Sequence, residues 1–226
     1  MNTSSPRQGL LHRTGHVLRA GLHTMRHYDF GSNLASVQDG VDVGTFERLA
    51  ASVAGDPGWQ ELLRERPRFQ LETVDLQGLA ELPDGTLGRE LLRHLVDHDL
   101  LHGERHPDNP YPASEQAEYA KIRWRETHDV RHVLTGVETS VHDEIVLQAF
   151  QLGQFFNWFS VTTMLGGPFL SPRDSLRPKM LRDCYTAFDA GRQAKPMFTV
   201  YWERLYAQPV SELRERFNVR WIGPRP

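Results

Sequence analysis

Residues 114–136, SEQAEYAKIRWRETHDVRHVLTG, and residues 140–159, SVHDEIVLQAFQLGQFFNWF, are the two stretches that decide the fold. Ser114 is a helix N-cap, and Gly136 suits the end of that helix because glycine readily adopts the left-handed conformation that follows a last turn. Ser140 opens a second helix with a variant of the capping box. The sequence therefore predicts a long central helix pair whose chain reverses direction between Gly136 and Ser140.

Helical periodicity recurs outside this pair, while strand signals are weak. Residues 68–76 alternate like a short extended piece, but no later segment offers a partner strand. Gly166-Gly167-Pro168 is expected to end the helix that begins at Ser140. We therefore predict an all-α protein, folded as a single compact multi-helix domain over residues 1–226. The predicted helices cover residues 45–53, 59–66, 87–95, 114–136, 140–165, 173–192, 197–206 and 210–217.

The first 28 residues are basic and contain no acidic residue, as in a mitochondrial transit peptide. Four of their histidines, however, are spaced to share one face of a helix with neighbouring leucines. We favour a basic amphipathic helix that belongs to the domain, with a disordered arm over residues 1–13 as the alternative for the very start. The four histidines are His12, His16, His23 and His27.

The composition excludes several classes of protein. The chain has 226 residues, 26 basic against 29 acidic side chains and a net charge of −3, which argues against a nucleic-acid binder that relies on positive charge. No apolar run approaches the roughly 18 residues of a membrane-spanning helix. One cysteine, Cys184, excludes a disulfide framework and a thiolate-rich metal site. The 11 histidines direct attention to metal binding through imidazole and carboxylate.

The strongest chemical signal is His128-Asp129-Val130-Arg131-His132. Histidines at positions i and i+4 share one helix face and can reach one cation, and Asp129 lies on the same arc. Glu144 follows in the first turn of the next predicted helix, so a tight reversal would return its carboxylate to this face. Two histidines, an aspartate and a glutamate suit zinc or another divalent ion, with room for substrate or water.

The alternative is that these residues form the solvent-exposed face of a surface helix. His128 and His132 belong to a polar stripe with Lys121, Arg125 and Thr135, and Glu144, Gln148 and Gln151 form a similar stripe. A second copy of the motif, His98-Asp99-Leu100-Leu101-His102, lies where a helix ends and has Ser114 in place of the distant glutamate. We interpret it as a decoy, and we set aside the histidines in i,i+4 arrays without a correctly placed carboxylate: His12, His16, His23, His27, His94, His98, His102 and His106.

The metal motif with its distant glutamate resembles that of the coenzyme Q biosynthesis protein four family. Other family landmarks occur in the same order, and the similarity covers residues 14–219. This start leaves too few residues for a cleavable transit peptide. The landmarks are Glu65-Arg66-Pro67-Arg68, Val74-Asp75-Leu76, Leu82-Pro83-Asp84-Gly85-Thr86-Leu87-Gly88-Arg89-Glu90, Gly166-Gly167-Pro168 and Tyr201-Trp202-Glu203-Arg204.

The resemblance implies an all-helical protein of ubiquinone biosynthesis. The implied reaction is a metal-dependent, oxidative C1 decarboxylation of a 4-hydroxy-3-methoxy-5-polyprenylbenzoate. His128, Asp129, His132 and Glu144 carry over as the catalytic metal ligands, with zinc as the first choice and magnesium, manganese and iron as alternatives. Asp129 is either a ligand or a base that orients His128. The metal would act as a Lewis acid on the substrate carboxylate or phenolate.

The implied partners are a polyprenylated aromatic or isoprenoid lipid, the membrane surface, other quinone-biosynthesis enzymes and a second copy in a homodimer, but no nucleic acid. The implied location is the bacterial cytoplasm at the inner membrane, or the matrix side of the mitochondrial inner membrane in a eukaryote. Aromatic residues in 155–159 either belong to the core or line a groove for the isoprenoid tail. Two other functions stay open: a non-catalytic isoprenoid or quinone-precursor carrier and scaffold, and an unrelated metallohydrolase.

Overall fold

The computed structural model describes residues 32–70, 74–101, 111, 113–170 and 177–223, together with residues 14, 15, 17 and 19. Within these residues the protein is helical and has no β-strand, which confirms the all-α prediction. The histidines of the predicted basic N-terminal helix lie outside the described residues. The helices are α2 (Ser32–Val41), α3 (Thr45–Ser52), α4 (Pro57–Glu65), α5 (Leu76–Glu81), α6 (Leu87–Asp97), α7 (Glu115–Glu126), α8 (His128–Thr135), α9 (Val141–Gln154), α10 (Trp158–Leu170), α11 (Arg177–Gln193) and α12 (Val210–Phe217), with a short 3₁₀ helix η1 (Trp202–Leu205).

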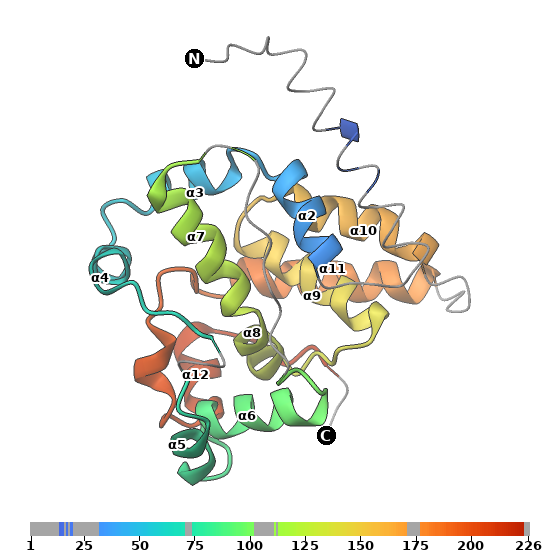
Figure 1. Ribbon diagram of the computed structural model, residues 1–226. Helices are drawn as coiled ribbons and strands as arrows, with labels where there is room; N and C mark the ends of the chain where they lie inside the picture. The colour runs from blue at the N-terminus through green and yellow to red at the C-terminus, as the bar shows by residue number, and fades with distance from the viewer. Residues whose placement is uncertain are drawn as a thin grey trace.

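The helices pack around two hydrophobic clusters. In Figure 1, α9, α10 and α11 form one side of the molecule, α5 and α6 lie at the opposite end from α3, and α8 lies between α6 and α9. The larger cluster joins α6, α8, α9, α11 and α12, and the smaller one joins α3, α4 and α7. Gly191 lets α11 approach α9 closely, since a Cβ there would lie within van der Waals radii of the Phe150 carbonyl oxygen.

The predicted helix over residues 114–136 is broken at Thr127, so this prediction was wrong in its continuity. Ser114 caps α7 by accepting a hydrogen bond from the Ala117 backbone nitrogen at 3.1 Å. The break follows from Arg131, which is buried and donates to the Trp124 carbonyl oxygen at 2.6 Å and to the Thr127 hydroxyl at 3.2 Å. The guanidinium thus occupies a carbonyl that an uninterrupted helix would use for its own backbone.

The helix predicted to run from Ser140 to Gly166 is also two helices. Ser140 caps α9 as expected, accepting from the Asp143 backbone nitrogen at 3.2 Å. α9 ends at Gln154 because Phe155 is extended, with φ −159° and ψ 152°. Asn157 then caps α10 by accepting from the Ser160 backbone nitrogen at 2.7 Å. Residues 166–168 do not end this helix, which continues to Leu170.

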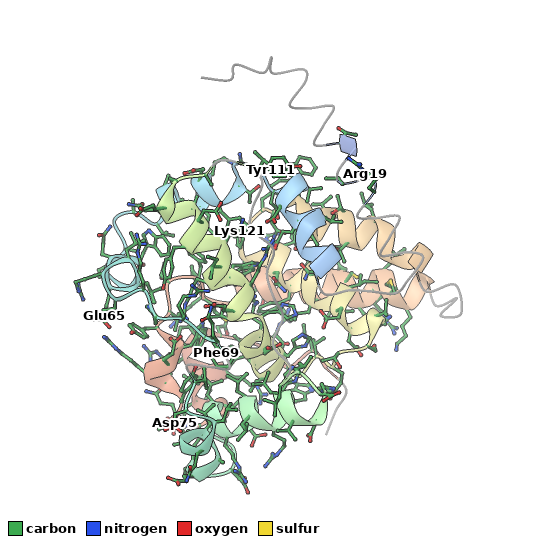
Figure 2. The ribbon with its side chains drawn as sticks, in the orientation of Figure 1. Arg19, Glu65, Phe69, Asp75, Tyr111 and Lys121 are labelled. Atoms are coloured by element: carbon green, nitrogen blue, oxygen red, sulfur yellow. The ribbon has the colours of Figure 1, made fainter. Side chains whose placement is uncertain are left out.

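Two more predictions need correction. No α-helix forms over residues 197–206, where the regular element is the short η1. Tertiary hydrogen bonds engage the segment before it: the Met197 nitrogen donates to Gln154 Oε1 at 3.0 Å, and the Val200 carbonyl oxygen accepts from Arg123 at 3.4 Å. The extended interpretation of 68–76 misses α5, whose N-cap is Asp75, accepting from the Gly78 nitrogen at 2.8 Å. Phe69, labelled with Asp75 in Figure 2, packs edge-on against Tyr206 at 6.5 Å between ring centroids.

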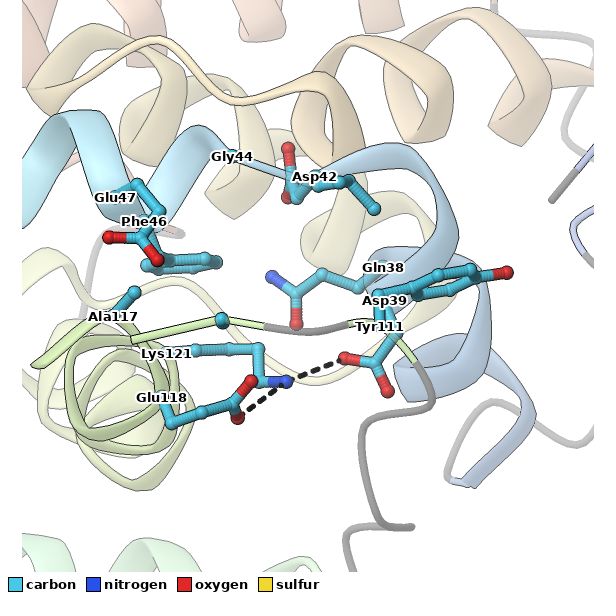
Figure 3. A pocket seen from close by; sticks show the side chains of 12 residues that line it. Gln38, Asp39, Asp42, Gly44, Phe46, Glu47, Tyr111, Ala117, Glu118 and Lys121 are labelled. Carbon is cyan, nitrogen blue, oxygen red and sulfur yellow. Dashed lines mark ion pairs between the residues drawn. The ribbon is translucent and has the colours of Figure 1, made fainter. Parts of the chain in front are cut away.

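Asp42, just after α2, caps α10 from a distance. Its Oδ1 accepts from the backbone nitrogens of Trp158 at 2.7 Å and Phe159 at 3.3 Å. Its Oδ2 is buried without a protein hydrogen-bond partner, as is Oδ2 of Asp39, and both residues line a cavity of about 30 Å³ (Figure 3), room for one water molecule. Lys121 pairs with Asp39 at 3.1 Å beside it. Burial raises the pKa of Asp42 to about 6, although the two backbone donors oppose the shift.

We expect Asp42→Asn to flatten the pH dependence of stability. Because the folded-state pKa is raised, the carboxyl contributes stability below about pH 4 that is lost as the pH rises through 6. The wild type should lose roughly 1 kcal/mol between pH 5 and 8 through this group, and the asparagine variant should not. Urea unfolding at both pH values measures the difference. Asp42→Ala, which removes the acceptor for two backbone donors, should cost about 1–3 kcal/mol at either pH. If the free energy of unfolding changed equally between pH 5 and 8 in the wild type and in Asp42→Asn, the raised pKa of Asp42 would be contradicted.

Candidate metal centre

The structure brings three of the four predicted ligands together where α8 and α9 meet. His128 and His132 lie on α8, and Glu144 lies in the first turn of α9. His132 Nε2 is 3.0 Å from His128 Nε2 and 3.2 Å from Glu144 Oε1, and His128 Nε2 is 3.3 Å from Glu144 Oε2. One ligand atom from each residue lies within 4.8 Å of the other two. The predicted return of Glu144 is therefore confirmed.

The buried members of the two polar stripes do not belong to a solvated helix face, whereas the side chains of His128 and Glu144 are 27% and 38% exposed. The polar stripe of α7 and α8 faces inward: Lys121 is 6% exposed, His132 2% and Thr135 0%. Gln148 and Gln151 of the stripe on α9 are also buried. The solvent-exposed alternative is thus wrong for these positions, and the two polar stripes meet inside the protein, where polar groups need partners.

The turn between α8 and α9 orients His132. Gly136 has φ +71° and its backbone nitrogen donates to the His132 carbonyl oxygen at 2.8 Å, so it ends α8 as predicted. The turn aims the Val137 carbonyl oxygen at His132 Nδ1, 2.8 Å away. An N–H at Nδ1 donating to this carbonyl leaves the lone pair of Nε2 directed toward His128 and Glu144, as a metal ligand requires.

A buried amide contacts His128. The side-chain Nε2 of Gln151 on α9, which is 2% exposed, lies 3.2 Å from His128 Nδ1 and donates to it, so a neutral His128 carries its own proton on Nε2, toward Glu144. Turning the amide over would present its oxygen to an N–H at Nδ1 and free Nε2 for a cation. The sequence analysis placed Gln151 only on a polar stripe and missed this contact. Gln151 lies seven residues, or two helical turns, after Glu144 on the same face of α9, and this spacing could have indicated it.

The two histidines beside Glu144 favour the ionised form of its carboxylate. Burial by itself would raise the pKa of Glu144, but the charges and hydrogen bonds of His128 and His132 lower it well below its ordinary value. Burial would lower the pKa of His132, and the contact with Glu144 outweighs this and raises it. Glu144 is therefore ionised at neutral pH, as a metal ligand must be, and protons on the imidazoles compete with a cation.

Asp129 is not a member of this group of three. It belongs to a second group with His94 and His132, in which His94 Nε2 lies 3.7 Å from Asp129 Oδ1. Burial would raise the pKa of Asp129, but contact with His94 and the charges of His128 and His132 lower it. Grouping His94 with the histidines that lack a carboxylate was wrong, because its carboxylate comes from another helix.

The second copy of the motif behaves differently from the first. α6 ends at Asp97 and Asp99 has φ +56°, so the helix stops there as predicted. His98 Nε2 lies 3.3 Å from Glu138, and its Nδ1 lies 2.9 Å from the Thr139 hydroxyl. His98 is in neither group of potential ligands among the described residues, and His102 lies outside them.

The aromatic residues 155–159 divide between core and surface. Phe155 packs edge-on against Trp124 at 4.6 Å between ring centroids, and Phe159 is buried. Phe156 and Trp158 are 55% and 49% exposed. The segment thus contributes to the core and also presents two large apolar side chains to the outside.

Comparison with known proteins identifies relatives over nearly the whole chain. Residues 7–222 match the model of the family "Coenzyme Q (ubiquinone) biosynthesis protein Coq4". The chain is 30% identical to the mitochondrial ubiquinone biosynthesis protein COQ4 homolog of Rattus norvegicus, covering 99% of this chain and 81% of that protein. It is 32% identical to the homolog of Homo sapiens, covering 77% and 66%. A crystal structure of a putative ubiquinone biosynthesis protein from Nostoc punctiforme superposes with a TM-score of 0.70 at 25% identity, covering 90% and 97%.

Proposed function

Because this chain belongs to the coenzyme Q (ubiquinone) biosynthesis protein Coq4 family, we propose that it decarboxylates a polyprenylated hydroxybenzoate at ring carbon 1 with the help of a divalent metal. The proposed substrate is a 4-hydroxy-3-methoxy-5-polyprenylbenzoate. The bond from C1 to the carboxyl group breaks, CO₂ leaves, and a proton takes its place. In the oxidative form a hydroxyl group takes its place instead: water supplies the oxygen atom, and dioxygen accepts the two electrons and leaves as hydrogen peroxide.

The convergence of His128, His132 and Glu144 carries this proposal. The ligands of a tetrahedral zinc ion lie about 3.3 Å apart. The two imidazole Nε2 atoms are 3.0 Å apart, and the Glu144 carboxylate approaches them through different oxygens, Oε1 at 3.2 Å from His132 and Oε2 at 3.3 Å from His128, so the donor set suits such an ion. Zinc is the first choice, and magnesium, manganese or iron are alternatives. When bound, the metal supplies Lewis acidity toward a carboxylate or phenolate oxygen.

The chain's own residues give the site a closed side and an open side. The side chain of His132 is 1% exposed, whereas those of His128 and Glu144 are 27% and 38% exposed. A substrate carboxylate therefore approaches past His128 and Glu144. The Val137 carbonyl and the Gln151 amide hold the two imidazole rings in place, which limits the rearrangement needed on binding.

Exposed apolar side chains support contact with the prenyl tail and with a membrane surface. They lie on α10, on α11 and between α9 and α10, and exposed apolar side chains that gather into a patch commonly mark interaction sites. Among the described residues no helix is long and apolar enough to cross a membrane. The curated relatives are mitochondrial proteins, and we propose peripheral binding to an energy-transducing inner membrane beside other quinone-biosynthesis enzymes. The side chains are Phe156, Trp158, Leu165, Leu181 and Tyr185.

The same exposed apolar side chains favour a second candidate function, a non-catalytic isoprenoid carrier and scaffold. An assay of carboxyl-labelled substrate in vesicles, with each metal and with or without dioxygen, decides between the two. We expect the metal-loaded wild type to release labelled CO₂, His132→Ala to release none, and His142→Ala, whose imidazole pairs with Asp183 outside the site, to match the wild type. Binding without release in all metal forms would support the carrier. Phosphate release from a simple phosphoester, abolished in His128→Ala, would instead indicate a metallohydrolase.

A further inference from the structure

His94 lies on α6 and reaches the candidate metal centre. α6 is anchored through its apolar face, where Leu91 and Leu95 are buried, and through the Leu87 backbone nitrogen, which donates to the Gln208 carbonyl oxygen at 2.9 Å. α6 packs against α8. This packing directs His94 toward Asp129 and His132, although more than thirty residues separate them in the chain.

The contacts of His94 are those of an orienting group. Its ring stacks on the His132 ring at 5.0 Å between centroids, with 24° between the ring planes. Its Nε2 is buried, has no protein hydrogen-bond partner, and faces Asp129 Oδ1 at 3.7 Å. The side chain itself is 10% exposed, compared with 24% for Asp129. A buried imidazole nitrogen needs a partner, and Asp129 is the carboxylate that it faces.

We propose that His94 is a positioning residue of the metal centre, which holds the Asp129 carboxylate through Nε2, while its stacking on the His132 ring is ordinary packing. The inference rests on the proposed metal-dependent function for its consequence, but the contact itself does not require a metal. His94 does not act as a ligand of the group formed by His128, His132 and Glu144, because it falls outside their 4.8 Å cluster. Side chains that orient ligands typically change metal affinity by about 10–100-fold when removed.

Two substitutions separate positioning from simple packing. Phenylalanine keeps the ring and the stacking but loses the nitrogen, whereas glutamine loses the ring and places an amide nitrogen near the position of Nε2. If His94 only fills space, His94→Phe should bind metal like the wild type and His94→Gln should bind it more weakly. If His94 positions Asp129, His94→Gln should bind metal like the wild type and His94→Phe should bind it more weakly. We expect His94→Phe to bind Co²⁺ about 10-fold or more weakly and His94→Gln within about threefold of the wild type.

The readout is Co²⁺ titration by visible absorption, which reports affinity and ligand field together. The absorption bands should stay unchanged in His94→Phe, because the ligands stay the same. In a protein that already carries Asp129→Asn, adding His94→Phe should not change the affinity for Co²⁺ further. Unchanged affinity in His94→Phe, or a shifted spectrum that indicates a lost ligand, would overturn the proposal. His98→Phe, one turn along, is the matched control and should bind Co²⁺ like the wild type.

A double-mutant cycle on the metal-free protein tests the contact independently. We expect the unfolding equilibrium constants of His94→Phe, Asp129→Asn and the double variant to be non-additive by about fivefold or more. The cycle of His98→Phe with Asp129→Asn should be additive. Failure of the wild type to bind Co²⁺ would contradict the metal-dependent function, whereas additivity in the His94 cycle would overturn the role of His94.

Discussion

Replacing Glu144 with glutamine is expected to lower the affinity for zinc by more than about 100-fold. The substitution keeps the size of the side chain but removes the charge that faces His128 at 3.3 Å and His132 at 3.2 Å. The remaining ligands are two imidazoles, which carry no charge to offset that of the cation. Competition with a chromophoric chelator, followed by metal analysis after dialysis, measures the loss.

A second glutamate provides the control for this loss. Glu138 also pairs with a histidine, His98, at 3.3 Å, but it lies outside both groups of potential ligands. Glu138→Gln should therefore keep zinc affinity within about twofold of the wild type, and both variants should retain the helical circular dichroism spectrum. If Glu144→Gln retains zinc while His102→Ala, in the second copy of the motif, loses it, the assignment of the site is wrong.

Replacing Gly136 with alanine is expected to destabilise the protein by roughly 3 kcal/mol. The left-handed backbone, with φ +71°, costs an L-residue about 1–2 kcal/mol. The added Cβ would also lie 2.3 Å from Trp221 Cζ2, and such overpacking typically costs about 1–3 kcal/mol. Trp221 cannot move away freely, since Arg214 stacks on its ring at 4.4 Å and the next residue, Ile222, donates its backbone N–H to the Thr135 carbonyl at 2.9 Å.

The same substitution links stability to the metal centre. Moving this turn displaces the Val137 carbonyl that orients His132, so metal affinity should fall together with the urea midpoint. Gly55→Ala is the control, because a Cβ there meets no atom within 4 Å and the backbone is not left-handed. It should change the free energy of unfolding by less than about 0.5 kcal/mol. A Gly136→Ala midpoint equal to that of the wild type would show that the turn can rearrange without cost.

Local signals predicted those parts of the fold that depend on neighbouring residues. Ser114 and Ser140 cap helices as expected because a hydroxyl needs only the backbone N–H three residues on. Gly136 ends α8 because glycine, which has no Cβ, adopts the left-handed conformation that follows the last turn without a steric cost. The spacing of His128 and His132 and the short reversal before Glu144 are local as well, which is why sequence reasoning could place these three residues together.

The break between α9 and α10 has a cause that is distant in the chain, whereas the break at Thr127 follows from Arg131, four residues further on. Asp42 supplies the carboxylate that receives the first backbone N–H groups of α10, more than a hundred residues away, so the pattern in 140–166 indicated one continuous helix. The end of α8 shows the same dependence. Arg214 donates to the carbonyl oxygens of Val133 and Leu134 at 2.9 Å and 2.8 Å, which no local pattern predicts.

The amino-acid sequence predicts an all-helical chain, its principal caps and the three residues that converge at the candidate metal centre, because each of these depends on spacing along one helix or across one short turn. Tertiary packing determines that most of the two polar stripes faces inward, that Asp129 faces His94 on another helix, and that the helix predicted after Ser140 is interrupted at Phe155. These features depend on which helices pack together, and helix packing is set by the burial of apolar faces distributed over the whole chain.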